Sequence, residues 1–67
     1  MVPVTSSTLA AVGYDADRRQ LHLEFVSGER YVYSDVDEWV YHELLNAESK
    51  GSYFNRHVRE QYGFTQE

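Results

Sequence analysis

The stretch Gln20-Leu21-His22-Leu23-Glu24-Phe25-Val26 decides the fold, because apolar and polar side chains alternate along it. A period of two is typical of a strand with one buried face, since successive side chains point to opposite sides of a sheet. Ser27-Gly28 follows and predicts a tight turn, because glycine adopts a positive φ without strain. The segment 29–34 is rich in tyrosine and valine and predicts the antiparallel partner strand. Together these residues predict a β-hairpin.

Upstream of the hairpin, the apolar segment Leu9–Tyr14 predicts a first strand, and the charged segment 15–19 predicts a turn that connects the two. Residues 1–8 contain Pro3 and end in four hydroxyl residues, and we expect them to form a loose arm. Gly63 is a natural helix terminator, so residues 63–67 are expected to form a frayed tail. The sequence therefore predicts one domain over residues 1–67, with a folded core at 9–62.

Downstream of the hairpin, the sequence predicts two amphipathic helices. Asp35, with Glu38 three residues later, resembles a capping box at the start of a helix that ends near residue 46 or 47. Its apolar face groups Val36, Val40, Tyr41, Leu44 and Leu45. The second helix is expected to run from a Ser52 cap to about Tyr62. Its inner ridge is either Phe54, Val58 and Tyr62 or Tyr53 and His57.

The fold class that follows is α+β, with the element order β-β-β-α-α. Amphipathic helices must bury their apolar faces, and one side of a small antiparallel sheet is the surface available to them. We therefore expect a three-stranded antiparallel sheet followed by two helices packed on one of its faces. Leu23, Phe25, Val40, Leu44 and Phe54 are expected among the most buried residues.

Composition excludes several classes of function. The chain has no cysteine, so disulfides and thiol chemistry are absent, which agrees with a cytoplasmic location. Residues 1–11 contain no lysine or arginine and predict no signal peptide, and no segment approaches the roughly 20 apolar residues of a membrane span. The net charge of -5 opposes binding to nucleic acid and to anionic membranes. The charges are segregated, however: residues 35–48 hold five acids and no base, and residues 50–59 hold three bases and no acid.

The basic segment suggests an anion-binding site at the start of the second helix. Lys50, Gly51 and Ser52 stand where unpaired backbone N–H groups and a partial positive charge are expected, and Arg56 and Arg59 follow. These residue types predict binding of RNA or of another phosphate-bearing ligand. The alternative is purely structural: the glycine allows a tight turn between helices, and the serine only caps.

Strand register decides whether Tyr31 and Tyr33 belong to this site. With a two-residue turn at Ser27-Gly28, Leu23 pairs with Val32, and both tyrosines lie on the outer face, where an aromatic pair can stack on bases. A loop one residue longer reverses the faces and places both tyrosines in the core. Both registers remain open.

The polar face of the first helix offers a different site. Trp39 lies there beside Glu38 and His42, and exposed aromatic residues are enriched at interface hot spots. This face predicts a protein-interaction module as the alternative to RNA binding, unless the indole folds back over Val36 or Val40. A homodimer through an open sheet edge is a third reading, so we expect a monomer or a weak homodimer.

Neither a catalytic nor a metal site is predicted. His22, His42 and His57 fall on three different predicted elements without metal-ligand spacing, and no cysteine assists them. No nucleophile is paired with a base in a cleft. We therefore expect a non-enzymatic binding domain without a metal or cofactor.

An ordered set of motifs resembles the KTSC family. The motifs are Ser6-Ser7, Ala11-Val12-Gly13-Tyr14, Leu21-x-Leu23-x-Phe25-x-Ser27-Gly28, Tyr31-Val32-Tyr33, Val40-Tyr41, Leu44-Leu45 and Lys50-Gly51-x-Tyr53-Phe54-Asn55. They cover about residues 5–62. The resemblance implies a short domain that occurs at the C-terminus of some lysyl-tRNA synthetases and as a small free-standing protein in bacteria and phages. That context suggests RNA binding, against which the acidic segment 35–48 counts.

Overall fold

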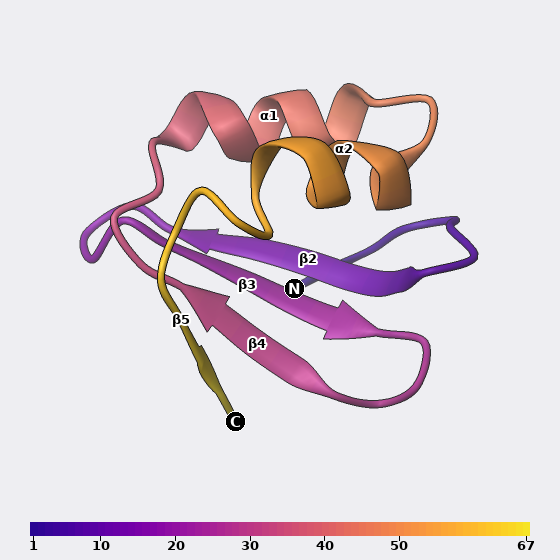
Figure 1. The fold of residues 1–67 in the computed structure, drawn as a ribbon, viewed down its shortest axis with the longest axis horizontal. Coiled ribbons are helices and arrows are strands. Elements are labelled where there is room, and N and C mark those ends of the chain that lie inside the picture. Colours follow the sequence, from indigo (N-terminus) through magenta and orange to yellow (C-terminus); the bar gives the residue numbers. More distant parts are fainter.

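A five-stranded antiparallel sheet forms one layer of the computed structural model, which describes residues 1–67, and two helices form the other layer (Figure 1). The strands are neighbours in chain order: β1 (Val2–Pro3), β2 (Leu9–Asp15), β3 (Gln20–Phe25), β4 (Arg30–Tyr33) and β5 (Phe64–Gln66). Helices α1 (Glu38–Asn46) and α2 (Lys50–His57) cover one face of the sheet and leave the other face bare. The α+β class with two helices on an antiparallel sheet is confirmed, and the expected number of three strands is wrong.

The two additional strands come from the segments predicted as a loose arm and a frayed tail. Val2 of β1 pairs with Val12 of β2, and Thr65 of β5 pairs with Val32 of β4. The pairing extends beyond the strands, since the Ser34 N–H donates to the Gly63 carbonyl at 2.9 Å. Strands of two and three residues are too short to show a period of two, so the pattern of the sequence could not reveal them. They pair with both edges of the central three strands.

The register of the β3–β4 hairpin turns the tyrosines inward. Leu21 pairs with Tyr33 and Leu23 pairs with Tyr31, and the Phe25 N–H donates to the Glu29 carbonyl at 2.9 Å. The loop therefore has three residues, 26–28, and Gly28 has the expected positive φ, at 97°. The register built on a two-residue turn is wrong, and the alternative with a longer loop is confirmed. One additional loop residue exchanges the two faces of β4, so the large rings enter the space under the helices.

The hydrophobic core lies between the sheet and the two helices. Its side chains are at most 5% exposed: Leu9, Val12, Leu21, Leu23, Tyr33, Val36, Val40, Leu44, Phe54 and Val58. Four of the five residues expected to be most buried belong to it. Of the first ridge expected for α2, Phe54 and Val58 are buried, but Val58 is the C-cap, and Tyr62 lies beyond the helix and is half-buried. Phe25 is only half-buried, because its ring borders a pocket described below.

Helix α1 begins two residues later than a cap at Asp35 would predict. Asp37 is the N-cap, but its side chain makes no capping hydrogen bond and is paired instead with Arg19. Asp35 has a φ of 59°, a left-handed conformation that bends the chain between β4 and α1. This conformation replaces the capping box that the sequence predicted.

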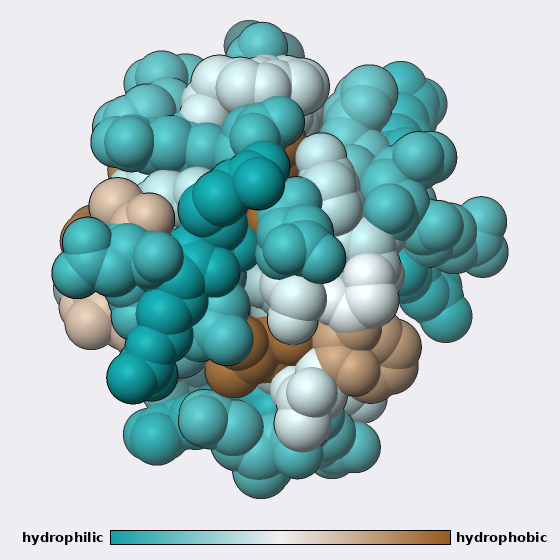
Figure 2. All heavy atoms as spheres, turned by 90° about the vertical axis from the view of Figure 1, so that its left-hand side faces the viewer, coloured by the Kyte–Doolittle hydropathy of each residue, from teal (hydrophilic) through white to brown (hydrophobic).

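The surface outside the core is mainly polar. Figure 2 shows the end of the molecule that carries the β2–β3 connection, where hydrophobic areas are small and separate. Neither helix is long and apolar enough to cross a membrane.

Candidate functional site

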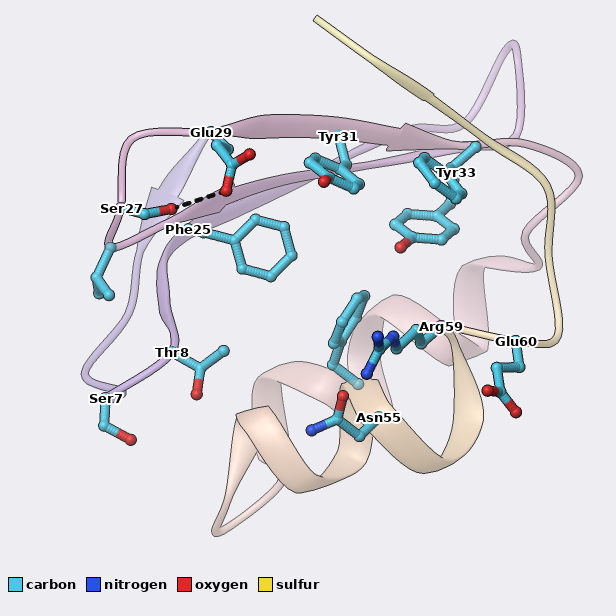
Figure 3. Close-up of a pocket in the computed structure, with 13 residues that line it drawn as sticks. Ser7, Thr8, Phe25, Ser27, Glu29, Tyr31, Tyr33, Asn55, Arg59 and Glu60 are labelled. Carbon is cyan, nitrogen blue, oxygen red and sulfur yellow. Dashed lines mark hydrogen bonds between the residues drawn. The ribbon is translucent and has the colours of Figure 1, made fainter.

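The larger of two hollows lies between the inner face of the β3–β4 hairpin and α2 (Figure 3). Its volume is about 630 Å³, within the roughly 300–1,000 Å³ typical of small-molecule sites. Five rings form its wall: Phe25, Tyr31, Tyr33, Phe54 and Phe64. The remaining lining residues are Ser7, Thr8, Val26, Ser27, Glu29, Asn55, Arg59 and Glu60. We call this hollow the aromatic pocket.

The rings of the aromatic pocket are held by contacts with one another. Phe25 meets Tyr31 and Phe54 edge to face, with ring centroids 5.2 and 5.4 Å apart. Phe64 of β5 stacks on Tyr31 at 5.0 Å. These separations are those that aromatic pairs prefer, and each pair adds about 0.5–1.5 kcal/mol to the burial of area. The pocket is therefore preformed by the packing of the core.

Tyr33 is the one wall residue that is both fully buried and polar. Its side chain is 1% exposed, and its hydroxyl makes no hydrogen bond within the protein but points into the pocket (Figure 3). Burial raises the pKa of Tyr33, the neighbouring Tyr31 raises it further, and the Arg59 guanidinium acts in the opposite direction. No buried side-chain oxygen or nitrogen lacks a partner, so the ring of Tyr33 is buried while its hydroxyl opens into the pocket.

Arg59 brings the only cation of the aromatic pocket. It follows α2, where its N–H donates to the Phe54 carbonyl at 2.9 Å, and its side chain lies with Asn55 on the α2 side of the hollow (Figure 3). Arg59 forms no ion pair. Glu29, which lines the pocket from the β4 end of the hairpin loop, does not pair with it, because its carboxylate accepts hydrogen bonds from Ser27 and Gln66, both at 3.2 Å. The Arg59 guanidinium is therefore free to contact a ligand.

The second hollow lies at the start of α2 and has a volume of about 340 Å³. No hydrophobic side chain lines it; the residues are Thr5, Ser6, Ser7, Thr8, Glu48, Ser49, Lys50, Gly51, Ser52 and Asn55. We call it the polar pocket. The Lys50 ammonium lies back over the turn between the helices and donates to the Ala47 carbonyl at 3.1 Å.

The start of α2 differs from the prediction by three residues. Ser49, not Ser52, is the N-cap, and its hydroxyl accepts from the Ser52 N–H at 3.3 Å. Ser52 is therefore the third residue of the helix, and its N–H is already satisfied. The N–H groups of Lys50 and Gly51 remain without a partner, as expected in a first helical turn. The helix ends at His57 rather than near Tyr62.

Gly51 has a packing role that the sequence did not reveal. A Cβ atom on this residue would lie 2.8 Å from the Thr8 hydroxyl oxygen, closer than side chains ordinarily approach. The glycine therefore allows the loop of residues 5–8 to lie directly against α2. That loop is fixed from within, since the Ser6 hydroxyl accepts from the N–H groups of Thr8 and Leu9 at 3.1 and 3.2 Å.

The two pockets adjoin each other, because Ser7, Thr8 and Asn55 line both. We call them together the groove. One group of predicted site residues, Tyr31, Tyr33 and Arg59, lines the aromatic part, and a second group, Lys50, Gly51 and Ser52, lines the polar part.

Arg56 lies outside the groove. It is exposed in the last turn of α2 and lines neither pocket.

Sequence reasoning missed the three residues that join the pockets. Ser7 and Thr8 belong to a run of four hydroxyl residues, Thr5–Thr8, in the segment expected to be a loose arm. Asn55 stood inside the basic segment and follows the core residue Phe54. The run of hydroxyl residues was the signal that the sequence offered for this part of the site. These residues line the groove because their loop packs directly against Gly51 of α2.

The residues proposed for protein contact lie on the exposed side of α1. Trp39 is 58% exposed, so its indole does not fold back over the helix. The Glu38 carboxylate lies 3.2 Å from the His42 ring nitrogen across one helical turn. None of the three lines a pocket, and no cluster of three His, Asp or Glu residues could hold a metal ion.

The chain belongs to the KTSC domain family, whose model matches residues 5–62. It is 40% identical over 62 residues to a protein of Tsukamurella paurometabola, with 92% of each chain covered. It is also 40% identical over 60 residues to a lysine–tRNA ligase of Nostoc sp., covering 90% of this chain and 11% of the ligase. The crystal structure of a KTSC domain protein from Yersinia pestis matches with a TM-score of 0.91 at 32% identity, covering 97% of this chain and 92% of that one. The resemblance inferred from the motifs is confirmed.

Proposed function

We propose that this chain is a small, non-enzymatic RNA-binding domain of the cytoplasm. In this proposal an unpaired base enters the aromatic pocket and a neighbouring phosphate lies over the polar pocket. The observation that carries it is the adjacency of the two pockets, with one cation in each, Arg59 and Lys50. Recognition of single-stranded RNA combines aromatic side chains that stack on splayed bases with cations that follow the backbone.

The relatives support a role with RNA. Two of them are named lysine–tRNA ligases and therefore act on a tRNA, and the present chain matches about a tenth of their length, 11%. A domain shared between such an enzyme and small proteins fits an appended RNA-contacting module. This support is associative, since a shared fold does not by itself assign a function.

Electrostatics limit how this RNA binding can work. The chain carries a net charge of -5, and Glu29, Glu48 and Glu60 line the groove together with its two cations. Few phosphates can be neutralised, so stacking must supply most of the affinity. With one or two phosphate contacts, log K should fall with log salt at a slope of about -0.7 to -1.4 for a single strand.

The test compares groove variants with a matched control outside the groove. We expect a labelled single-stranded RNA to bind the full chain more tightly than a duplex of the same length, and to shift the amides of Gly51–Phe54. Arg59→Ala and Lys50→Ala should each weaken binding and reduce the salt slope by about 0.7. Arg56→Ala removes a similar charge from the same end of the chain, outside both pockets, and should change little.

Two results would contradict this proposal. One is equal weakening by Arg56→Ala and Arg59→Ala, which would mean that RNA responds only to general charge. The other is the absence of any shift at Gly51–Phe54 at low ionic strength.

A second candidate function rests on the exposure of Trp39. Its side chain is 58% exposed on a helix face that carries Glu38 and His42. Such an indole is a candidate anchor for a protein partner. Capture of a partner from the native host that survives nuclease treatment, and that is lost in Trp39→Ala but kept in Arg59→Ala, would favour this function.

A further inference from the structure

The hydroxyl of Tyr33 is the strongest indication of what the aromatic pocket accepts. The side chain is only 1% exposed, and its hydroxyl points into the hollow and has no partner in the protein (Figure 3). No buried side-chain oxygen or nitrogen lacks a partner, so the ring is buried while the hydroxyl itself opens into the hollow. A ligand that displaces water from this hydroxyl loses affinity unless it replaces the hydrogen bond, so we expect a donor or acceptor at its inner end.

The rest of the pocket requires a flat ligand. Tyr31 and Phe64 are nearly parallel, with 14° between their planes, whereas Phe25 and Phe54 stand edge-on to the tyrosines at 77° and 76°. The walls thus offer both ring faces and ring edges, the two surfaces that aromatic rings prefer. A phosphate or a flexible aliphatic chain would leave these surfaces unused.

The mouth of the pocket carries polar side chains of types that hydrogen-bond to the edge of a base. Asn55 and Arg59 line the α2 side of the hollow (Figure 3), and neither side chain has a hydrogen-bond partner in the protein. An amide both donates and accepts, and a guanidinium donates along a fixed plane. Side chains of these two types pair with base edges in nucleic-acid recognition.

We infer that the aromatic pocket binds a single nucleobase, with the Tyr33 hydroxyl as the hydrogen-bonding group at its inner end. Asn55 and Arg59 hydrogen-bond the base at the mouth, and the sugar leaves the pocket toward Ser7 and Thr8, where the polar pocket begins. This inference rests on the proposed function and names the part of the RNA that the aromatic pocket takes. It predicts that an uncharged nucleoside binds without any phosphate.

The experiment titrates the full chain, labelled at amides and aromatic rings, with adenosine, guanosine, cytidine and uridine, and separately with ribose 5-phosphate. At least one nucleoside should shift the ring signals of Tyr33 and the side-chain amide of Asn55, and ribose 5-phosphate should not. A series of RNAs, each lacking one base, should include one that binds more weakly than the intact RNA, namely the one that lacks the base that enters the pocket. These two measurements separate the base from the backbone.

Substitution of the hydroxyl alone provides the sharpest test. Tyr33→Phe keeps the ring in the core and should weaken nucleoside binding by about threefold to tenfold, the effect of one net hydrogen bond. Tyr41→Phe is the matched control. Tyr41 of α1 is half-buried, stacks on Tyr14 of β2 and lines neither pocket. Asn55→Ala, at an exposed position, should weaken binding without any change in the core.

The outcomes distinguish this inference from the proposed function. If RNA binds through the polar pocket but nucleosides leave the Tyr33 ring unshifted and abasic RNA binds as tightly as intact RNA, the nucleobase pocket is wrong and the RNA proposal stands. If nucleosides bind at Tyr33 while RNA does not bind, the nucleobase pocket stands and the RNA proposal is overturned. Equal effects of Tyr33→Phe and Tyr41→Phe would also overturn the inference.

Discussion

The aromatic pocket and the polar pocket adjoin, but they relate to the stability of the fold in opposite ways. Tyr33 and Phe54, in the wall of the aromatic pocket, are 1% and 5% exposed and belong to the core. In the wall of the polar pocket, Lys50 and the residues Thr5–Thr8 are exposed or half-buried, and short-range hydrogen bonds fix the Lys50 ammonium and the Ser6 hydroxyl. In the first pocket a change to a buried wall residue is also a change of stability, whereas in the second pocket side chains can be exchanged while the fold remains.

The largest expected effect is a loss of stability in Phe54→Ala, which removes a buried ring from the wall of the aromatic pocket. Phe54 packs on Phe25 and Tyr33, with ring centroids 5.4 and 5.7 Å apart. Removal of its ring should lower the free energy of unfolding by about 3–5 kcal/mol, measured by urea denaturation. Val26→Ala is the control, because Val26 lines the same pocket but is 60% exposed, and it should change stability by less than about 0.5 kcal/mol. Unchanged melting of Phe54→Ala would show that the wall is not part of the core.

Gly51→Ala tests the contact that joins the two pockets. Alanine ordinarily stabilises a helix interior relative to glycine by about 1 kcal/mol. Here we expect a loss of about 1–3 kcal/mol, because the new Cβ would meet the Thr8 hydroxyl at 2.8 Å and force the loop away from α2. Thermal unfolding of Gly51→Ala, Thr8→Ala and the double variant would show partial recovery in the double variant.

Gly63→Ala is the matched control for this substitution. No atom lies within 4 Å of the position of its Cβ, so stability should stay the same or rise slightly. A stabilising Gly51→Ala would mean that the loop 5–8 does not pack on the helix.

The central hairpin and the inner faces of both helices could be predicted, because they depend on periods of two and of about four along the sequence. Leu23, Val40 and Leu44 are buried as their spacing predicts. The terminal strands and the helix starts could not be predicted in this way. Strands as short as β1 and β5 are specified by backbone pairing with β2 and β4, and such pairing leaves no pattern in the side chains.

The candidate site could be predicted only in two separate halves. Tyr31-Val32-Tyr33 and Lys50-Gly51-Ser52 were recognisable as residue types, but a single loop residue at the β3–β4 turn decides whether the tyrosines face the helices. Arg56 and Arg59 look equivalent in the sequence, and the end of α2 after His57 separates them in space. The contribution of Asn55 depends on a tertiary contact, which no local pattern encodes.

A smaller effect is expected at the cap of α2, which belongs to the polar pocket alone. Ser49→Ala removes the acceptor of the Ser52 N–H and should cost about 1 kcal/mol, measured by thermal unfolding. Ser52→Ala, at the third helical position, should cost less, because its hydroxyl only receives a hydrogen bond from Ser49 at 3.0 Å. The reverse order would restore Ser52 as the cap that the sequence suggested.

The smallest effect concerns alkaline pH and involves the aromatic pocket alone. Burial raises the pKa of Tyr33 above the value of about 10 found in an unfolded chain, with Tyr31 acting in the same direction and Arg59 against it. Above pH of about 10 the unfolded chain therefore loses this proton before the folded chain does, so the free energy of unfolding falls until the pH passes the folded pKa. Burial raises the pKa of Tyr53 as well, with a contribution from Glu43, and gives a decline of the same sign.

Urea denaturation at a series of pH values from about 8 to 11 separates these contributions. Tyr33→Phe should show a shallower alkaline decline than the natural chain, because one of the two phenols whose pKa is raised no longer titrates. Arg59→Ala should show a steeper decline, since the cation that lowers the pKa of Tyr33 is gone. Tyr53→Phe removes a phenol that lines neither pocket, and should flatten the decline without changing its response to Arg59→Ala. If Arg59→Ala leaves the alkaline decline unchanged, the guanidinium does not face Tyr33 across the pocket, and the hydroxyl and the cation cannot act on one ligand.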